Sequence, residues 1–184
     1  MTWTVDEPMA RSCHAIAHEG RVWLVDPLTD DEALDAAEAL GDIAGVIQLL
    51  DRHDRDSETL ARRYDVPYLR LPEQLPDTPF AVSRMVWLPG WRELSLWLPS
   101  QSALVVAESV GTGAYFALAG RPAGIHPMLR LRPPGGLRAH RPRHLMVGHG
   151  PSLHDGAAEA LDEALARSLK DIPRVPAAMV QAYR

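Results

Sequence analysis

The order of short apolar runs and helix-like segments is the feature that most constrains the fold of this chain. Strand-like runs cover Cys13 to Ala17, Arg21 to Val25 and Ile43 to Leu50. Helical patterns lie between them and after them, at 29–41 and 57–64. Short apolar runs are typical of buried strands, whereas apolar residues three and four apart indicate helices. Their alternation predicts an α/β architecture.

The second half of the chain continues this pattern with more strands and one longer helix. We expect strands at Pro67 to Leu71, Arg84 to Leu88, Glu93 to Leu98, Ala103 to Ala107 and Arg143 to Val147, and a helix at Ala157 to Leu169. The Pro- and Gly-rich run 122–136 is expected to form a loop at the edge of a cleft. Neither a linker nor a repeat interrupts the sequence, and its 184 residues fit a single domain over 1–184.

A histidine between two glycines follows the last expected strand, in Leu145-Met146-Val147-Gly148-His149-Gly150. Glycines on both sides allow a sharp backbone turn and leave space around the imidazole. The motif therefore suits a histidine presented at a strand end toward a cleft. A tight surface turn with an incidental histidine is the structural alternative, and three residues alone are a weak signal.

Composition indicates a protein of the cytoplasm. Cys13 is the only cysteine, which excludes an intrachain disulfide and fits a reducing compartment. The first residues have neither the basic start nor the apolar core of a signal peptide. No apolar run has the length that spans a membrane, so we expect no membrane partner.

Charge is distributed unevenly along the chain. The formal net charge is -5, yet the stretch 109–154 has no acidic residue and contains six arginines. Such a stretch can present a positive face to an anion or to RNA. The anion-binding candidates are Arg130, Arg132, Arg138, Arg141 and Arg143. Aromatic residues for base stacking do not alternate with them, so we do not expect nucleic-acid binding.

The strand ends also resemble those of the metallo-β-lactamase fold superfamily, from about Ala15 to Leu169. Members have an aspartate after an early strand, and Asp26 occupies that place. After the next strand they have a Thr-His-X-His-X-Asp-His motif, and here the sequence is Asp51-Arg52-His53-Asp54-Arg55-Asp56-Ser57. In this alignment Asp56 matches the motif aspartate. Arg52, Asp54 and Ser57 replace the three histidines, and His53 falls on a variable position.

Two further positions depart from the family pattern and one is retained. Trp91 stands where the family has a histidine after a Pro-Gly turn, and Glu108 replaces the bridging aspartate. His149 keeps the last histidine of the pattern. The resemblance implies a four-layer αβ/βα sandwich, in which two mixed β-sheets pack face to face with helices on the outer faces. It also implies a site that has lost most of its metal ligands.

The cleft candidates that follow from this resemblance are Asp26, Arg52, His53, Asp54, Asp56, Trp91, Glu108 and His149. Several have a structural interpretation as well. Asp56 can cap the helix that follows it, and His53 can be a hydrogen-bonded histidine of a turn. Trp91 can fill the volume that a metal cluster occupies in the family. We expect Asp56, Glu108 and Asp54 to converge with His149, and Arg52 or Arg55 to neutralise the carboxylates.

Three functions remain open at this point. The first, which we favour from the sequence, is a non-catalytic binding or structural module with no metal and no cofactor. The second is a hydrolase with one zinc, iron or manganese ion held by Asp56, Glu108, His149 and His53, acting on an ester, lactone, thioester or phosphodiester. The third is binding of an anion or RNA through 109–154. A small-molecule ligand is compatible with all three, and the sequence identifies neither the substrate nor the oligomeric state.

Overall fold

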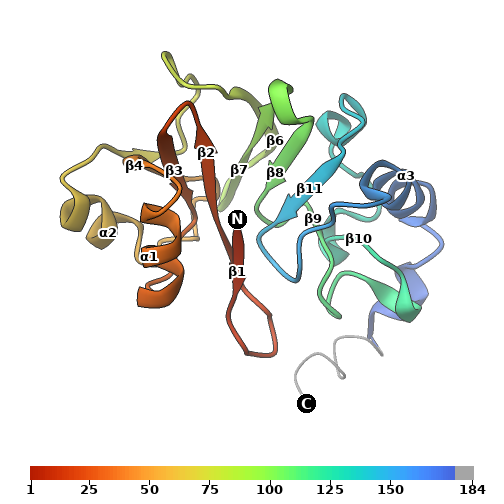
Figure 1. The fold of residues 1–184 in the computed structure, drawn as a ribbon. Helices are drawn as coiled ribbons and strands as arrows, with labels where there is room; N and C mark the ends of the chain where they lie inside the picture. The colour runs from red at the N-terminus through yellow and green to blue at the C-terminus, as the bar shows by residue number, and fades with distance from the viewer. Residues whose placement is uncertain (177–184) are drawn as a thin grey trace.

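Two mixed β-sheets form the centre of the computed structural model, which describes residues 1–176 (Figure 1). The first sheet has the strand order β1-β2-β3-β4-β5. Its strands are β1 (Thr2–Thr4), β2 (Ser12–His18), β3 (Arg21–Val25), β4 (Asp42–Gln48) and β5 (Tyr68–Arg70). β1, β2 and β3 pair antiparallel, whereas β3, β4 and β5 pair parallel.

The second sheet has the order β11-β8-β7-β6 and is also mixed. Its strands are β6 (Ala81–Leu88), β7 (Trp91–Leu98), β8 (Ala103–Val106) and β11 (His144–Val147). β6, β7 and β8 run antiparallel, and β11 lies parallel to β8. A two-stranded ribbon of β9 (Val110–Gly111) and β10 (Gly124–Ile125) stands beside this sheet.

Helices cover the outer faces of both sheets (Figure 1). The helices α1 (Asp31–Glu38) and α2 (Ser57–Tyr64) lie on the five-stranded sheet, and α3 (Ala157–Arg167) lies on the side of the four-stranded sheet. Five short 3₁₀ turns complete the described elements: Pro99–Gln101, Leu118–Gly120, Pro127–Leu129, Gly135–Arg138 and Ile172–Arg174. The predicted sandwich of two sheets between outer helices is confirmed.

Successive apolar side chains of a strand point to alternate faces, which explains why the five-stranded sheet is covered on both faces. In β3, Val22 and Leu24 pack with the apolar residues of α1 and α2, while Trp23 and Val25 face the core between the sheets. Successive side chains of a strand point to opposite faces, so a continuous apolar run suits a sheet buried on both sides. The core between the sheets continues to α3 through Leu161 and Leu165.

Three local predictions need correction. The helix expected over 29–41 spans only Asp31–Glu38, and its cap is Asp30, whose carboxylate accepts the Ala33 N–H at 3.0 Å. Asp56 precedes α2, but its side chain makes no capping hydrogen bond there. The segment 122–136 is less irregular than expected, because it contains β10 and two 3₁₀ turns with Ile125 and Leu129 buried.

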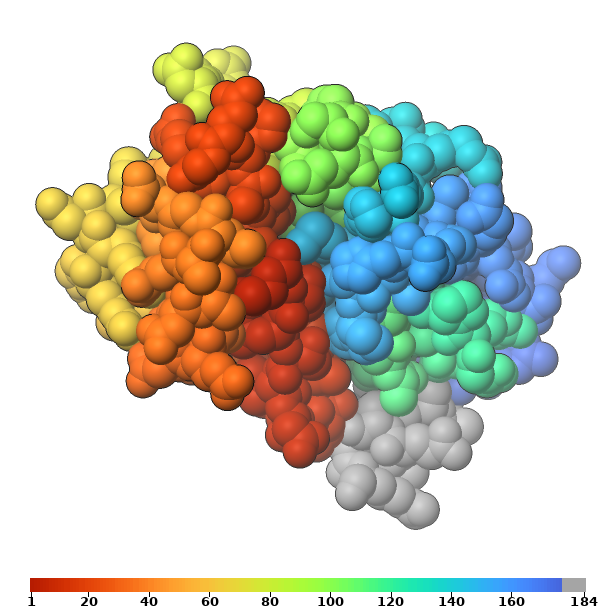
Figure 2. All heavy atoms as spheres, viewed as in Figure 1, coloured from red at the N-terminus to blue at the C-terminus, as the bar shows by residue number. Residues whose placement is uncertain are grey.

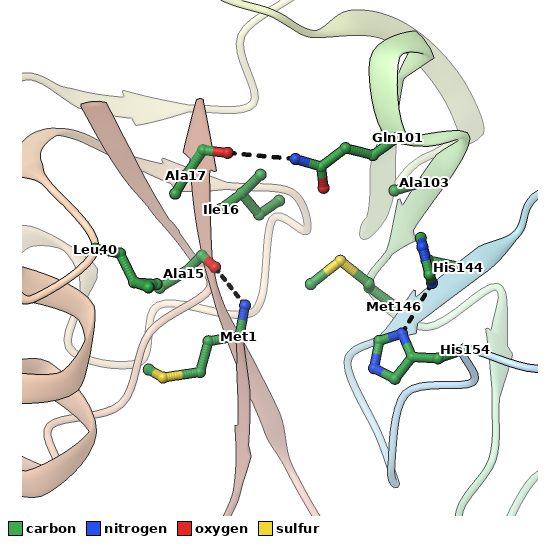
Figure 3. Close-up of a pocket in the computed structure, with 10 residues that line it drawn as sticks. All are labelled: Met1, Ala15, Ile16, Ala17, Leu40, Gln101, Ala103, His144, Met146 and His154. Atoms are coloured by element: carbon green, nitrogen blue, oxygen red, sulfur yellow. Dashed lines mark hydrogen bonds between the residues drawn. The ribbon is translucent and has the colours of Figure 1, made fainter. Parts of the chain in front are cut away.

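The N-terminal and C-terminal halves of the chain meet along a seam on one face (Figure 2). A pocket of about 300 Å³ lies there, lined from one side by Met1, Ile16 and neighbouring residues and from the other by residues such as Met146 (Figure 3). Ala103 and His144, at the starts of β8 and β11, also line it. Within residues 1–176, no helix has the length and apolar character needed to cross a membrane.

Candidate metal centre

Four strands of the two sheets end at the same edge of the sandwich. Asp26 follows β3, and His53 lies in the turn after β4. Glu108 follows β8, and His149 follows β11 in the neighbouring sheet. Parallel pairing of β3 with β4 and of β8 with β11 places the carboxyl ends of each pair side by side. Residues distant in sequence are thereby brought into contact.

The ligating atoms of His53, Glu108 and His149 all lie within 4.8 Å of one another. The Nε2 atom of His53 is 3.3 Å from Oε1 of Glu108, and the Nε2 atom of His149 is 3.6 Å from the same oxygen. In a tetrahedral zinc site with bonds near 2.0–2.1 Å, two ligand atoms are about 3.4 Å apart. The two distances to Glu108 therefore resemble the separation between ligands of one small cation.

The opposite nitrogens of both imidazoles are fixed by hydrogen bonds. Nδ1 of His53 donates to Oδ2 of Asp26 at 3.1 Å, and Nδ1 of His149 donates to the Met9 carbonyl at 2.9 Å. A ligand histidine is usually oriented by such a bond from its second nitrogen. Among the residues described, Nε2 of His149 is buried and has no hydrogen-bond partner. Buried polar atoms are rarely left in this state, so this lone pair suits a ligand to a cation.

The glycines beside His149 are required by the close approach of other backbone. A Cβ atom on Gly148 would lie 2.3 Å from the Ala107 carbonyl oxygen. Gly150 has a positive φ of 93°, and a Cβ atom there would lie 2.3 Å from the Gly113 nitrogen. Only glycine fits both positions without displacing backbone. The motif is thus a turn that holds His149 against the loop after β8.

Arg52 neutralises the outer oxygen of Glu108. Its guanidinium donates to Oε2 of Glu108 and, at 3.2 Å, to the Gly90 carbonyl. The same group lies 4.4 Å from the centre of the Trp91 ring, a cation–π contact. The expected arginine partner of Glu108 is therefore present. Oε1 of Glu108 remains directed to the two histidines.

Charge and burial oppose each other in this cluster. Burial alone would raise the pKa of Glu108, but contacts with His149, His53 and Arg52 hold that pKa far below its usual range. Burial also opposes the charged form of His53, yet hydrogen bonds to Asp26 and Glu108 raise its pKa above the ordinary value. At Asp26 the hydrogen bond from His53 outweighs the effect of burial and lowers the pKa of the carboxyl group. Both carboxylates are thus ionised at neutral pH.

A buried glutamate that the sequence analysis missed holds the Glu108 loop in place. Oε1 of Glu93 accepts the backbone N–H groups of Ala107, Glu108 and Ser109 at 3.2, 3.0 and 2.9 Å. Its other oxygen accepts the indole N–H of Trp91 at 3.3 Å. A charged residue at the first position of an otherwise apolar expected strand was the one available signal.

Arg55 ties the His53 loop to both sheets. Its Nη1 donates to the carbonyls of Ser12 and Asp26 at 2.6 and 2.7 Å, and its Nη2 donates to the Gly148 carbonyl at 3.2 Å. Arg55 therefore bonds to backbone and does not neutralise a carboxylate of the cluster directly. This was not foreseen from the sequence.

Asp54 and Asp56 do not join the cluster, contrary to the expected convergence. The carboxylate of Asp56 accepts the Thr29 N–H at 2.7 Å. Asp54 lines a separate surface pocket with Arg62 and Arg70. Arg55 has a positive φ of 41°, which turns the chain between the two aspartates. The carboxylate that contacts His53 is therefore that of Asp26 and not that of Asp56.

A pocket of about 420 Å³ opens over Glu108 and Arg52. Its other lining residues are mostly apolar or aromatic: Met9, Leu88, Pro89, Gly90, Trp91, Tyr115, Phe116, His126 and Met128. Burial lowers the pKa of His126 to about 4, so its imidazole is neutral at pH 7. Nδ1 of His126 accepts the Met128 N–H at 3.2 Å, which leaves Nε2 to carry the proton. His126 was not predicted, since one histidine in a Pro-rich run has no distinctive pattern.

Three of the six arginines of 109–154, Arg121, Arg130 and Arg141, form ion pairs within the fold. Arg130 is buried and donates to the Phe116 carbonyl at 2.7 Å. Arg141 pairs with Asp162 and Glu159 of α3 at 2.9 and 3.5 Å. Arg130 and Arg141, two of the anion-binding candidates, are therefore engaged within the fold. Part of the charge asymmetry along the sequence is balanced within the fold.

Comparison with solved structures gives many matches, unlike comparison with family models and curated sequences. No protein-family model matches the chain, and no curated protein sequence matches it. The BLEG-1 B3 metallo-β-lactamase superposes with a TM-score of 0.56 at 13% identity, covering 85% of this chain and 95% of the other. ETHE1 from Myxococcus xanthus superposes with a TM-score of 0.57 at 12% identity, covering 100% and 97%.

The chain has the metallo-β-lactamase fold. A further structure of this fold, TTHA1623 in a di-iron-bound form, has a TM-score of 0.54 at 15% identity and covers 86% of this chain and 96% of its own. At such low identity the similarity establishes the metallo-β-lactamase fold and not an activity. Within that fold, His53, Glu108 and His149 form a possible metal site of three residues.

Proposed function

We propose that this protein binds one divalent metal ion through His53, Glu108 and His149 and that it hydrolyses an ester or thioester there. The observation that carries the proposal is the buried Nε2 of His149, which is unpartnered while Nδ1 is fixed by the Met9 carbonyl. Two imidazole nitrogens and one carboxylate form a ligand set that suits zinc, iron or manganese. Three protein ligands also leave a coordination position for substrate.

The residues around the cluster have separable tasks in this proposal. A divalent ion held there would act as a Lewis acid toward a carbonyl oxygen. Asp26 keeps Nε2 of His53 aimed at the cluster, and Arg52 keeps Glu108 ionised. The neutral His126 can donate its Nε2–H to a polar atom of the substrate. Trp91 and Phe116 line the pocket and keep bulk water away from these groups.

A metal-free binding module is the second candidate, and one observation favours it. Glu108 is already paired with Arg52, and His53 lies within hydrogen-bond distance of both Glu108 and Asp26. An internal pair of this kind competes with a cation for the same carboxylate. Because metal binding must displace the proton on Nε2 of His53, affinity should fall as the pH falls.

Metal content of the full chain decides between the two candidates. We expect about one equivalent of zinc, iron or manganese after purification without chelators or a metal-affinity tag, and lower thermal stability after chelation. His53→Ala and His149→Ala should lose the metal. His154→Ala is the matched control, because His154 contacts His144 outside the cluster and should leave metal content unchanged.

The same variants test the hydrolysis. The metal-loaded protein should cleave a p-nitrophenyl ester or an acyl thioester, and the chelated protein and His149→Ala should not. Protein that neither retains metal nor binds added zinc, iron or manganese would contradict this proposal and support the metal-free module. Metal binding without hydrolysis would support the proposed metal site and contradict the proposed hydrolytic activity.

A further inference from the structure

A second pocket adjoins the one over the candidate metal centre. It measures about 450 Å³, and its lining is largely apolar, with Met85 to Leu88 on β6 and, after β10, Met128, Leu129 and Leu131 to Gly135. Leu88 and Met128 line both pockets. The two cavities therefore adjoin each other at these residues, and each has the size of a small-molecule site.

Exposed apolar side chains are concentrated in this region. Leu131 and Met128 are 77% and 76% exposed, and Leu88 and Trp87 are 56% and 40% exposed. These four residues make up half of the eight large hydrophobic residues that are exposed within 1–176. Contiguous exposed apolar surface usually marks a binding site. We call the four, together with Met85 and Pro133, the apolar groove.

The charges along the groove favour a neutral or anionic occupant. Arg132 lines it, and the guanidinium group of Arg92 lies 5.4 Å from the Trp87 ring. Arg84, 4.4 Å from the same ring, is paired with the exposed Glu73. Glu108 is the one acidic residue among the described residues that line the two pockets, and it is paired with Arg52. A cationic ligand would meet these arginines, whereas a hydrocarbon chain would meet apolar walls. Pro133 and Pro134 stiffen one of those walls.

We propose that the apolar groove binds the hydrocarbon chain of an acyl ester or acyl thioester. Leu88 and Met128 join the groove to the pocket over Glu108, so a chain in the groove can place its carbonyl carbon beside the candidate metal centre. Hydrolysis would add water across the ester or thioester bond and release a carboxylic acid and an alcohol or thiol. This assignment of substrate class rests on the proposed function.

Binding of saturated fatty acids tests the groove without relying on activity. We would titrate chelated full-length protein with butyrate, hexanoate, octanoate and decanoate, by calorimetry and by tryptophan fluorescence. Each added methylene should tighten binding roughly two- to fourfold, as expected for partial to full burial of a CH₂ group. Leu131→Asp and Met128→Asp should abolish this dependence on chain length. Leu169→Asp, which alters an exposed leucine outside the groove, should retain it.

Each outcome separates the groove from the metal-dependent activity. Affinity that does not change with chain length would overturn the groove, even if metal-loaded protein hydrolyses esters. Chain-length dependence in protein that binds no metal would support the groove while removing the proposed hydrolysis. A second copy of the chain is the other occupant that the groove could bind, and light scattering tests for it. If the native protein is a dimer and Leu131→Asp dissociates it, the groove is a dimer interface and the proposal is overturned.

Discussion

At the scale of single residues, His126 shows how burial fixes a protonation state. It lies 4.7 Å from Trp91 between ring centres and contacts Phe116 and Tyr115 as well. Loss of hydration in this aromatic setting is the main reason that its pKa falls to about 4. The unfolded chain therefore takes up a proton on this histidine at a higher pH than the folded protein does. Folding is disfavoured as the pH falls from 6.5 toward 4.

This difference predicts a measurable pH dependence of stability. In His126→Asn, the asparagine oxygen can still accept the Met128 N–H, but the titration is removed. Between pH 7.5 and pH 5, the native protein should lose about 2 kcal/mol more unfolding free energy than the variant. Urea unfolding of chelated protein measures both, and the comparison cancels the opposite contribution of His53, whose pKa is raised. Parallel pH profiles would contradict the assigned protonation state.

Several residues of the metal-site cluster could be predicted from the sequence, but the residues of the loop 51–56 that face the cluster could not. His149 and Glu108 could be placed because each directly follows a predicted strand, and the glycines around His149 left little choice of backbone. The loop 51–56 could not be resolved in the same way. A positive φ at Arg55 turns Asp56 toward Thr29, and no pattern in the sequence reveals that turn. The carboxylate beside His53 is that of Asp26.

At the scale of elements, the loop between β8 and β9 depends on a residue of β7. Glu93 accepts three successive backbone N–H groups of that loop, including that of Glu108. Strands of seven or eight residues such as β4 and β7 were predictable, because long apolar runs have a clear period. The short strands β1, β9 and β10 could not be predicted, because a strand of two or three residues is stabilised by pairing with its neighbour and has too few residues to show a pattern of its own.

Replacing Glu93 should therefore affect both stability and metal binding. In Glu93→Gln, one carboxylate oxygen becomes an NH₂ group that cannot accept the bonds made to it. We expect a loss of about 1–3 kcal/mol in unfolding free energy of chelated protein. We also expect a roughly 10- to 100-fold weaker affinity for zinc, as for other residues that orient ligands. Glu73→Gln, at an exposed glutamate paired with Arg84, is the control and should change neither quantity. Equal metal affinity in both variants would rule out a positioning role for Glu93.

At the scale of the whole molecule, the site exists only because the two sheets are held in one relative position. His53 comes from the five-stranded sheet, and Glu108 and His149 come from the four-stranded sheet. Apolar packing between the sheets brings them together, but hydrophobic contact has no strict directional preference. Hydrogen bonds across the edge are needed to fix the alignment. Arg55 supplies one of them, to the Gly148 carbonyl after β11, while its bonds to the Ser12 and Asp26 carbonyls hold it on the five-stranded sheet.

Arg55→Met should therefore weaken the alignment of the two halves more than its position in a surface turn suggests. Methionine keeps much of the aliphatic stem but leaves the carbonyls of Ser12, Asp26 and Gly148 without the guanidinium donor. We expect a loss of about 2–4 kcal/mol in urea unfolding of chelated protein. Zinc affinity should fall as well, since the loop that carries His53 is no longer tied to the turn that carries His149. Arg62→Met is the matched control, because Arg62 makes an exposed pair with Glu58 within α2, and a pair of that kind contributes less than about 1 kcal/mol. If the two substitutions cost the same, Arg55 does not align the sheets, and the backbone hydrogen bonds Ser12 N–Gly148 O and Gly150 N–Ala10 O, together with apolar packing, set the geometry of the site.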